Sequence, residues 1–192
     1  PLIKVPLSTF NALRLAAQKT VQRQEDEGGL AFFAEWPEVP REVPDDSPLW
    51  IVQVDRSVAP TSLPPHESEP LFPDEEKTGP TEYNLLKLGL WLNGSQKTGH
   101  ADAQSIFAGL KETGAIANFP GLLDAEEIVK NHVEILESKL FWGKEIVFWR
   151  GARTGLFRNI IVPVVRAKKG VAEQYWSTLY YDWGQEHPSF KF

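Results

Sequence analysis

Basic and aromatic residues are concentrated between residues 144 and 169 of this chain. The window holds seven cations and one acid, Glu145, although the formal net charge of the whole chain is −6 at pH 7. Cationic side chains neutralise phosphates, and aromatic rings stack on unpaired bases, each stack contributing about 1–3 kcal/mol. The window therefore predicts a surface that binds single-stranded nucleic acid. The residues that we expect to form it are Lys144, Trp149, Arg150, Arg153, Phe157, Arg158, Lys168 and Lys169.

The same window has a second interpretation. Aromatic residues are enriched in strands, and edge strands often carry lysine, so the rings could belong to a core and the cations to the solvated rim of a sheet. The positions of Trp142, Trp149 and Trp176 separate the two interpretations. Exposed rings beside the arginines favour nucleic acid, whereas buried rings favour a scaffold.

No catalytic motif is evident. The sequence lacks a Gly-x-Ser-x-Gly elbow, a P-loop, a Rossmann glycine fingerprint and a His-Glu-x-x-His zinc helix. Its four histidines are not paired at metal-ligand spacing, and it contains no cysteine. We therefore expect no catalytic residues, no metal and no cofactor, and the sequence favours a protein without enzymatic activity over a small enzyme.

Length and composition indicate a globular protein. The 192 residues, 42% of them hydrophobic, fit one domain over 1–192 and can bury a core. No apolar run approaches the roughly 18 residues that cross a bilayer, so we expect a cytoplasmic protein that does not enter membranes.

Prolines and acidic residues dominate residues 58–80. This density of proline is incompatible with a central strand, so the segment is predicted to be a long acidic loop. We expect it to offer no apolar face to the core, and deletion of residues 62–77 to leave the fold intact. As an alternative to a passive loop, its acids could compete with nucleic acid for the basic window.

Hydrophobic periodicity predicts an α+β fold with a mainly antiparallel twisted sheet, or a small partly open barrel, and about three packed helices. In the helix expected after His100, Phe107 and Leu110 should be buried, and Asp124 should cap the next helix. The helices are expected at 9–24, 100–113 and 124–136, and the strands at 2–7, 30–36, 49–54, 85–92, 145–150, 159–167 and 175–182.

The order of elements over residues 85–169 resembles that of small phage-type single-stranded-DNA-binding proteins. The resemblance includes the stretch Phe-Trp-Gly-Lys-Glu-Ile-Val at 141–147 and a return strand that begins at Arg158 and Asn159. It implies an oligonucleotide-binding barrel in which a Gly-Lys pair opens one strand and a basic hairpin follows. The N-terminal segment and the proline-rich loop depart from this pattern.

The charge distribution supports an alternative function. Residues 1–80 carry seven basic and fourteen acidic residues. An acidic half of this kind suits a basic protein partner, as in an inhibitor, immunity or assembly protein. The sequence leaves open whether the chain forms a homo-oligomer.

Overall fold

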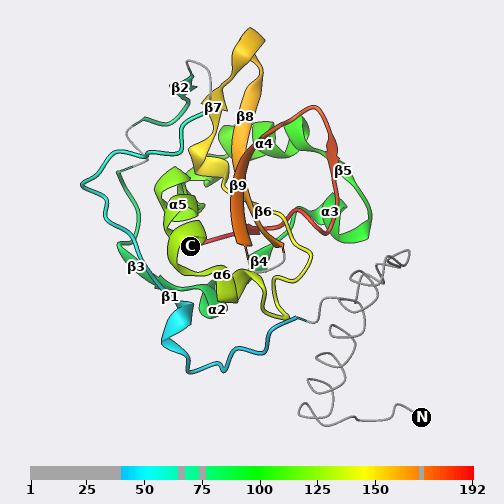
Figure 1. Ribbon diagram of the computed structural model, residues 1–192. Helices are drawn as coiled ribbons and strands as arrows, with labels where there is room; N and C mark the ends of the chain where they lie inside the picture. The colour runs from blue at the N-terminus through cyan, green and yellow to red at the C-terminus, as the bar shows by residue number, and fades with distance from the viewer. Residues whose placement is uncertain (1–39, 65–67, 74–76, 169–170) are drawn as a thin grey trace, which may run out of the picture. The chain divides into compact units, whose positions relative to one another are not determined.

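The structure is a computed structural model that describes residues 40–192 except 65–67, 74–76 and 169–170 (Figure 1). The chain divides into two units, Pro1–Val39 and Pro40–Phe192, of which the second is described. The elements expected at 2–7, 9–24 and 30–36 lie outside the described residues. The single domain over 1–192 therefore stays a prediction.

A seven-stranded sheet forms the centre of the described unit. Its long strands, β8 (Ile160–Lys168) and β9 (Val171–Thr178), pair as an antiparallel hairpin, and the strand expected at 175–182 begins four residues earlier and ends at Thr178. The other strands are β2 (Glu69–Pro70), β4 (Leu90–Trp91), β6 (Ile146–Val147), β7 (Arg153–Thr154) and β11 (Ser189–Phe190). The order is β2-β7-β8-β6-β11-β4, with β9 on the other side of β8, and only β6 and β11 pair in parallel. Over the described residues the sheet does not close into a barrel, and the α+β prediction is confirmed.

Two strand pairs lie outside this sheet. They join β1 (Ile51–Gln53) to β3 (Glu82–Asn84) and β5 (Ala101–Asp102) to β10 (Asp182–Trp183). Around β1 the predicted alternation is confirmed, because Trp50, Val52 and Val54 are buried and the residues between them are not.

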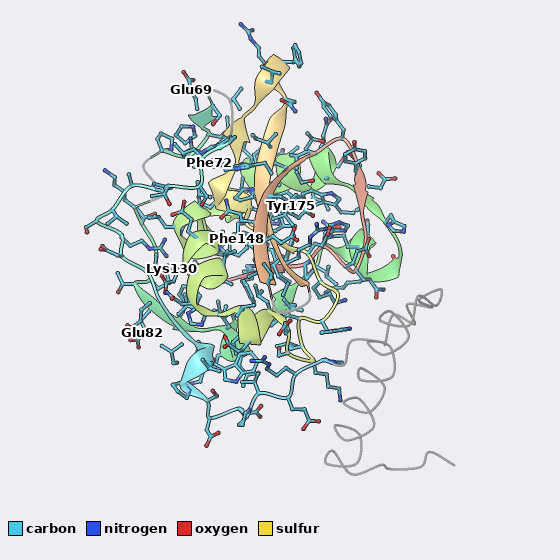
Figure 2. All side chains as sticks on the ribbon, in the orientation of Figure 1. Glu69, Phe72, Glu82, Lys130, Phe148 and Tyr175 are labelled. Atoms are coloured by element: carbon cyan, nitrogen blue, oxygen red, sulfur yellow. The ribbon has the colours of Figure 1, made fainter. Side chains whose placement is uncertain are left out.

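The described part of the chain contains five α-helices. They are α2 (Leu85–Leu88), α3 (Gly94–Thr98), α4 (Ala103–Glu112), α5 (Leu122–Asn131) and α6 (Val133–Leu136). Helices α5 and α6 contact β8 and β9 (Figure 1), and their apolar residues share one cluster with Val165. The apolar side of α4 belongs to a second cluster with Val162 and Val164. Because neighbouring side chains of a strand point to opposite faces, β8 separates the two clusters. Phe148 lies deep in the first cluster (Figure 2).

Helix α4 agrees with its sequence pattern. Asp102 caps it by accepting hydrogen bonds from the N–H groups of Gln104 and Ser105. The buried residues include Phe107 and Leu110, as the 3.6-residue period requires.

Two predicted elements are wrong. Residues 85–92 form α2 and the short strand β4 instead of one strand, because the Asn84 side chain caps α2 by accepting from the N–H of Lys87. Asp124 is not the N-cap residue of the second helix, which begins at Leu122, but lies in its first turn and accepts a hydrogen bond from the N–H of the N-cap residue Gly121. The expected single helix over 124–136 is also divided at His132, whose ring Nδ1 lies 2.8 Å from the carbonyl oxygen of Leu49.

The described parts of the 58–80 segment pack onto the fold, against expectation. Strand β2 pairs with β7, and the Phe72 ring lies 6.1 Å from that of Phe107 on α4. Farther back, the N–H groups of Thr61 and Ser62 donate to the carboxylate of Glu126 on α5. The segment thus offers the apolar face that the sequence did not predict.

Candidate binding site

Three of the predicted nucleic-acid contacts are buried. The exposed fractions are 1% for Trp149, 1% for Arg150 and 5% for Arg153. The sequence predicted a strand over 145–150, but only β6 is extended, and Trp149–Gly151 forms a 3-10 turn, η3, in which the side chains of Trp149 and Arg150 are buried. Arg153 lies on β7. The three side chains cannot make the predicted surface contacts in this fold. The burial of Trp149 favours the interpretation in which the aromatic rings of the window belong to the scaffold.

The interior supplies partners for these groups. The ring of Trp149 lies 5.1 Å from that of Trp183 and 6.2 Å from that of Phe107. Arg153 donates from a guanidinium nitrogen to the carbonyl oxygen of Ser68, 3.2 Å away. This bond adds to the β2–β7 pairing, and together they hold the proline-rich segment to the sheet.

Much of the remaining positive charge of the window is compensated. Arg166 forms ion pairs of 3.0 Å with both Glu145 and Glu173. Their carboxylates raise the pKa of the Arg166 guanidinium, chiefly through the hydrogen bonds that Arg166 donates to Glu173. The half-buried Lys144 donates to the carbonyl oxygen of Gln185 at 3.1 Å. The excess of cations in the sequence is therefore not an equal excess at the surface.

Phe157 and Arg158 are exposed, as predicted. They lie in the 3-10 turn η4 (Leu156–Arg158), between β7 and β8 at the top of Figure 1. Lys168 ends β8 at the other end of the strand, and Lys169 falls outside the described residues. The nine residues of β8 separate the two ends by roughly 30 Å. The structure does not bring these cations together.

The conformation of this turn is unusual. Phe157 and Arg158 both have φ of 61°, in the left-handed region that side chains with a Cβ rarely adopt. Two backbone hydrogen bonds close the turn. The Gly155 N–H donates to the Asn159 carbonyl oxygen at 2.7 Å, and the Arg158 N–H donates to the Gly155 carbonyl oxygen at 3.2 Å. Phe157 is 90% exposed and Leu156 51%. The turn holds an aromatic ring, an aliphatic chain and a cation away from the body of the fold. We call Leu156–Arg158 the hairpin tip.

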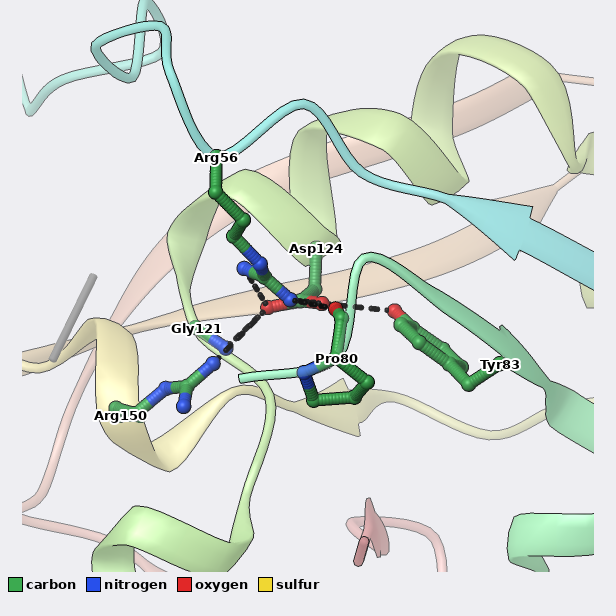
Figure 3. A network of polar contacts seen from close by, with 6 residues as sticks. All are labelled: Arg56, Pro80, Tyr83, Gly121, Asp124 and Arg150. Atoms are coloured by element: carbon green, nitrogen blue, oxygen red, sulfur yellow. Dashed lines mark hydrogen bonds and ion pairs between the residues drawn. The ribbon is translucent and has the colours of Figure 1, made fainter. Parts of the chain in front are cut away.

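A buried ion network surrounds Asp124 and includes Arg150 of η3 (Figure 3). The Asp124 carboxylate, fully buried, accepts two bonds from Arg56 at 2.6 and 2.9 Å and one from the Tyr83 hydroxyl at 2.9 Å. It also accepts from the N–H of Gly121 at 2.7 Å, and a guanidinium nitrogen of Arg150 lies 3.5 Å away. Burial, followed by the nearby carboxylate, raises the pKa of the Tyr83 hydroxyl well above its ordinary value, so this hydroxyl stays a donor.

The network has a structural role. Its groups bond to one another and to the backbone, since Arg56 also donates to the Pro80 carbonyl oxygen at 2.9 Å. Gly79 has φ of 102°, and a Cβ there would lie 2.8 Å from a nitrogen of Arg150. Sequence reasoning missed the network because Asp124 is 68 positions from Arg56 and 41 from Tyr83. No local pattern signals a contact over that separation.

A second polar cluster lies at the surface around His187. Its Nε2 lies 3.1 Å from a Glu145 carboxylate oxygen, its Nδ1 lies 3.1 Å from a Glu186 oxygen, and its ring stacks on Trp183. Among the described residues no hydroxyl group forms a hydrogen bond with this imidazole. The cluster ties the start of β6 to the β10–β11 connection. In the described part of the chain, no group of three or more histidine, aspartate or glutamate side chains is arranged to hold a metal ion.

Comparison with protein-family models, with curated proteins and with solved structures finds no match. The resemblance to phage-type single-stranded-DNA-binding proteins therefore stays a prediction. Within the ranges that the structure describes, no helix has the length and apolarity needed to cross a membrane.

Proposed function

We propose that this protein is a binding module that docks onto a partner protein through the hairpin tip. The observation that carries the proposal is the 90% exposure of Phe157 on a left-handed backbone. Such a conformation costs on the order of 1–3 kcal/mol per residue, and strained residues cluster at functional sites. Two successive residues of the tip have this strained backbone, and the aromatic ring of the first lies in solvent. The strain therefore does not serve to pack the ring into the core of this fold.

The composition of the tip suits a protein interface. Aromatic residues and arginine dominate the few positions that carry most binding energy at interfaces, and lysine is depleted there. Leu156, Phe157 and Arg158 would place an aliphatic and an aromatic group in an apolar pocket, with the guanidinium against a carboxylate at its rim. The partner surface is thus expected to be apolar and bordered by acid. This differs from the basic partner that the acidic N-terminal half suggests.

Substitution at Phe157 tests the proposal. Affinity capture with the wild-type chain should retain at least one protein that Phe157→Ser loses. Loss of a hot-spot ring worth about 2 kcal/mol weakens binding roughly 30-fold. Val171→Ser is the control, because Val171 is another exposed apolar residue and pairs with Lys168 at the end of β8 far from the tip. A set of captured proteins that Phe157→Ser leaves unchanged would refute this function.

Phe157→Gly separates binding from stability. Glycine adopts positive φ without steric cost, so this variant should unfold at a higher temperature than the wild type if the tip is strained. It should still lose the partner, because the ring is gone. Higher stability with lost binding is the signature of strain kept for function.

The exposed pair Phe157 and Arg158 also supports single-stranded nucleic-acid binding as a second candidate. Titration with a labelled oligonucleotide at two salt concentrations tests it. Arg158→Ala should reduce the slope of log affinity against log salt by about 0.7. Arg150 and Arg153 are unsuitable for this test, because their buried side chains belong to the fold. Absence of binding at low salt would exclude the nucleic-acid candidate and leave the protein-binding proposal in place.

A further inference from the structure

Strand β9 is an open edge of the seven-stranded sheet. It pairs with β8 along all eight of its residues, and over the described residues no strand pairs with its other side. No side chain of the strand is fully buried. Proteins usually guard long edges with lysine, proline or a bulge. Strand β9 contains neither residue type, and its register with β8 is continuous.

The hydrogen-bond pattern shows which backbone groups line this edge. The Ile160 carbonyl oxygen accepts from Leu179 N–H, whereas the Pro163 carbonyl oxygen accepts from Phe148 N–H on the opposite side of β8. Bonding direction alternates along an antiparallel ladder, so even-numbered residues of β8 face β9. Their partners in β9 are the odd-numbered residues. The outward N–H and C=O groups are therefore those of Ala172, Gln174, Trp176 and Thr178.

We propose that a second copy of this chain pairs with β9 in antiparallel fashion, about a two-fold axis at Tyr175. This axis sets Ala172 opposite Thr178 of the partner subunit and Gln174 opposite Trp176 of the partner subunit. All four outward residues then pair, giving about eight N–H···O bonds between the copies. An axis at position 174 or 176 pairs only three of the four. The register with the axis at Tyr175 therefore pairs more of the outward N–H and C=O groups of β9 than either neighbouring register.

The charges of β9 are compatible with this register. Glu173 is the only charged residue of the strand and already pairs with Arg166 at 3.0 Å. The axis sets it opposite Ser177 of the partner subunit, whose hydroxyl can donate to a carboxylate. The two Glu173 residues lie four positions apart along the ribbon, roughly 14 Å, beyond the screening length of about 8 Å at physiological salt. The pairing is independent of the hairpin tip and joins two sheets into one.

Sedimentation of the full chain tests the dimer. The mass of the wild type measured by sedimentation should be twice the 21.7 kDa of one chain. Gln174→Pro removes an outward N–H without removing a bond to β8, and should weaken the dimer at least tenfold. Gln174→Ala is the matched control: it loses the same side-chain contact with Ser62 but keeps the N–H, and should remain dimeric. We take a dissociation constant of about 100 µM as the upper limit for a weak specific complex. A wild-type protein that stays monomeric at this concentration would overturn the proposal.

A cysteine on the axis gives a second test that does not depend on the proline variant folding. The chain contains no cysteine, so one introduced thiol can only link to another copy. Tyr175 would face Tyr175 of the partner subunit in a pair that is not hydrogen-bonded, with Cα atoms about 4.5 Å apart, within disulfide range. Tyr175→Cys should form a disulfide-linked dimer under mild oxidation, and Ser177→Cys on the same face should not. Equal cross-linking of the two variants would refute the register.

Discussion

Replacement of Asp124 by asparagine should destabilise the fold more than any single surface substitution. Asparagine keeps the volume of the side chain and one oxygen, which can still accept from the N–H of Gly121, while the new amide group can donate to the Tyr83 hydroxyl oxygen. The change removes the negative charge between Arg56 and Arg150, whose side chains are 8% and 1% exposed. Two buried guanidinium groups would then lack a counter-charge.

The size of the effect follows from this burial. Breaking a buried ion pair by removing one partner costs about 3–5 kcal/mol, because the remaining charge stays desolvated. A kilocalorie shifts the melting temperature of a chain of this size by about 2–4 °C, so the expected fall is roughly 6–20 °C. The upper end applies if both arginines stay buried, and the lower end if one reaches water.

Thermal unfolding followed by circular dichroism measures the change, and chemical denaturation gives the free energy. Glu112→Gln is the matched control, since it neutralises an exposed carboxylate at the end of α4. It should change stability by less than about 0.5 kcal/mol. A loss of under about 1 kcal/mol for Asp124→Asn, as for an exposed ion pair, would show that the network does not hold the fold together.

Three further predictions concern α4 and its neighbours. Leu110→Ala should cost about 2–5 kcal/mol in chemical denaturation, because Leu110 is buried in the second cluster. Phe72→Ala should lower the melting temperature, and an unchanged value would show that the packing against α4 is not stabilising. Hydrogen bonds from the hydroxyl and N–H of Ser105 lower the pKa of Asp102 below 3.8. The contribution of the Asp102 carboxylate to the stability of the fold should be complete above that value and should be lost as pH falls through the lowered pKa. An NMR titration should show this step in the wild type and not in Asp102→Asn.

Local patterns in the sequence were enough to predict several elements. The spacing of the apolar residues, with Phe107 and Leu110 on the buried side, predicts α4 without reference to other parts of the chain. The apolar run at 159–167 likewise predicts β8. These features depend on residues a few positions apart.

The candidate site was only partly predictable. Phe157 and Arg158 are both exposed, as predicted. The left-handed backbone of the tip was not foreseen, because neither residue type favours positive φ. Leu156 was missed since an aliphatic residue in a turn normally packs inward.

What the sequence by itself determined is the identity of the charges and the local elements that carry them. Whether each cation is exposed was decided only by the tertiary structure. Arg150 and Arg158 are eight positions apart in one basic window, yet the first is buried against Asp124 and the second is in solvent. A buried charge is stable only beside a counter-charge, and that partner comes from a distant part of the chain. Long-range packing therefore sets which residues of the window can meet a partner.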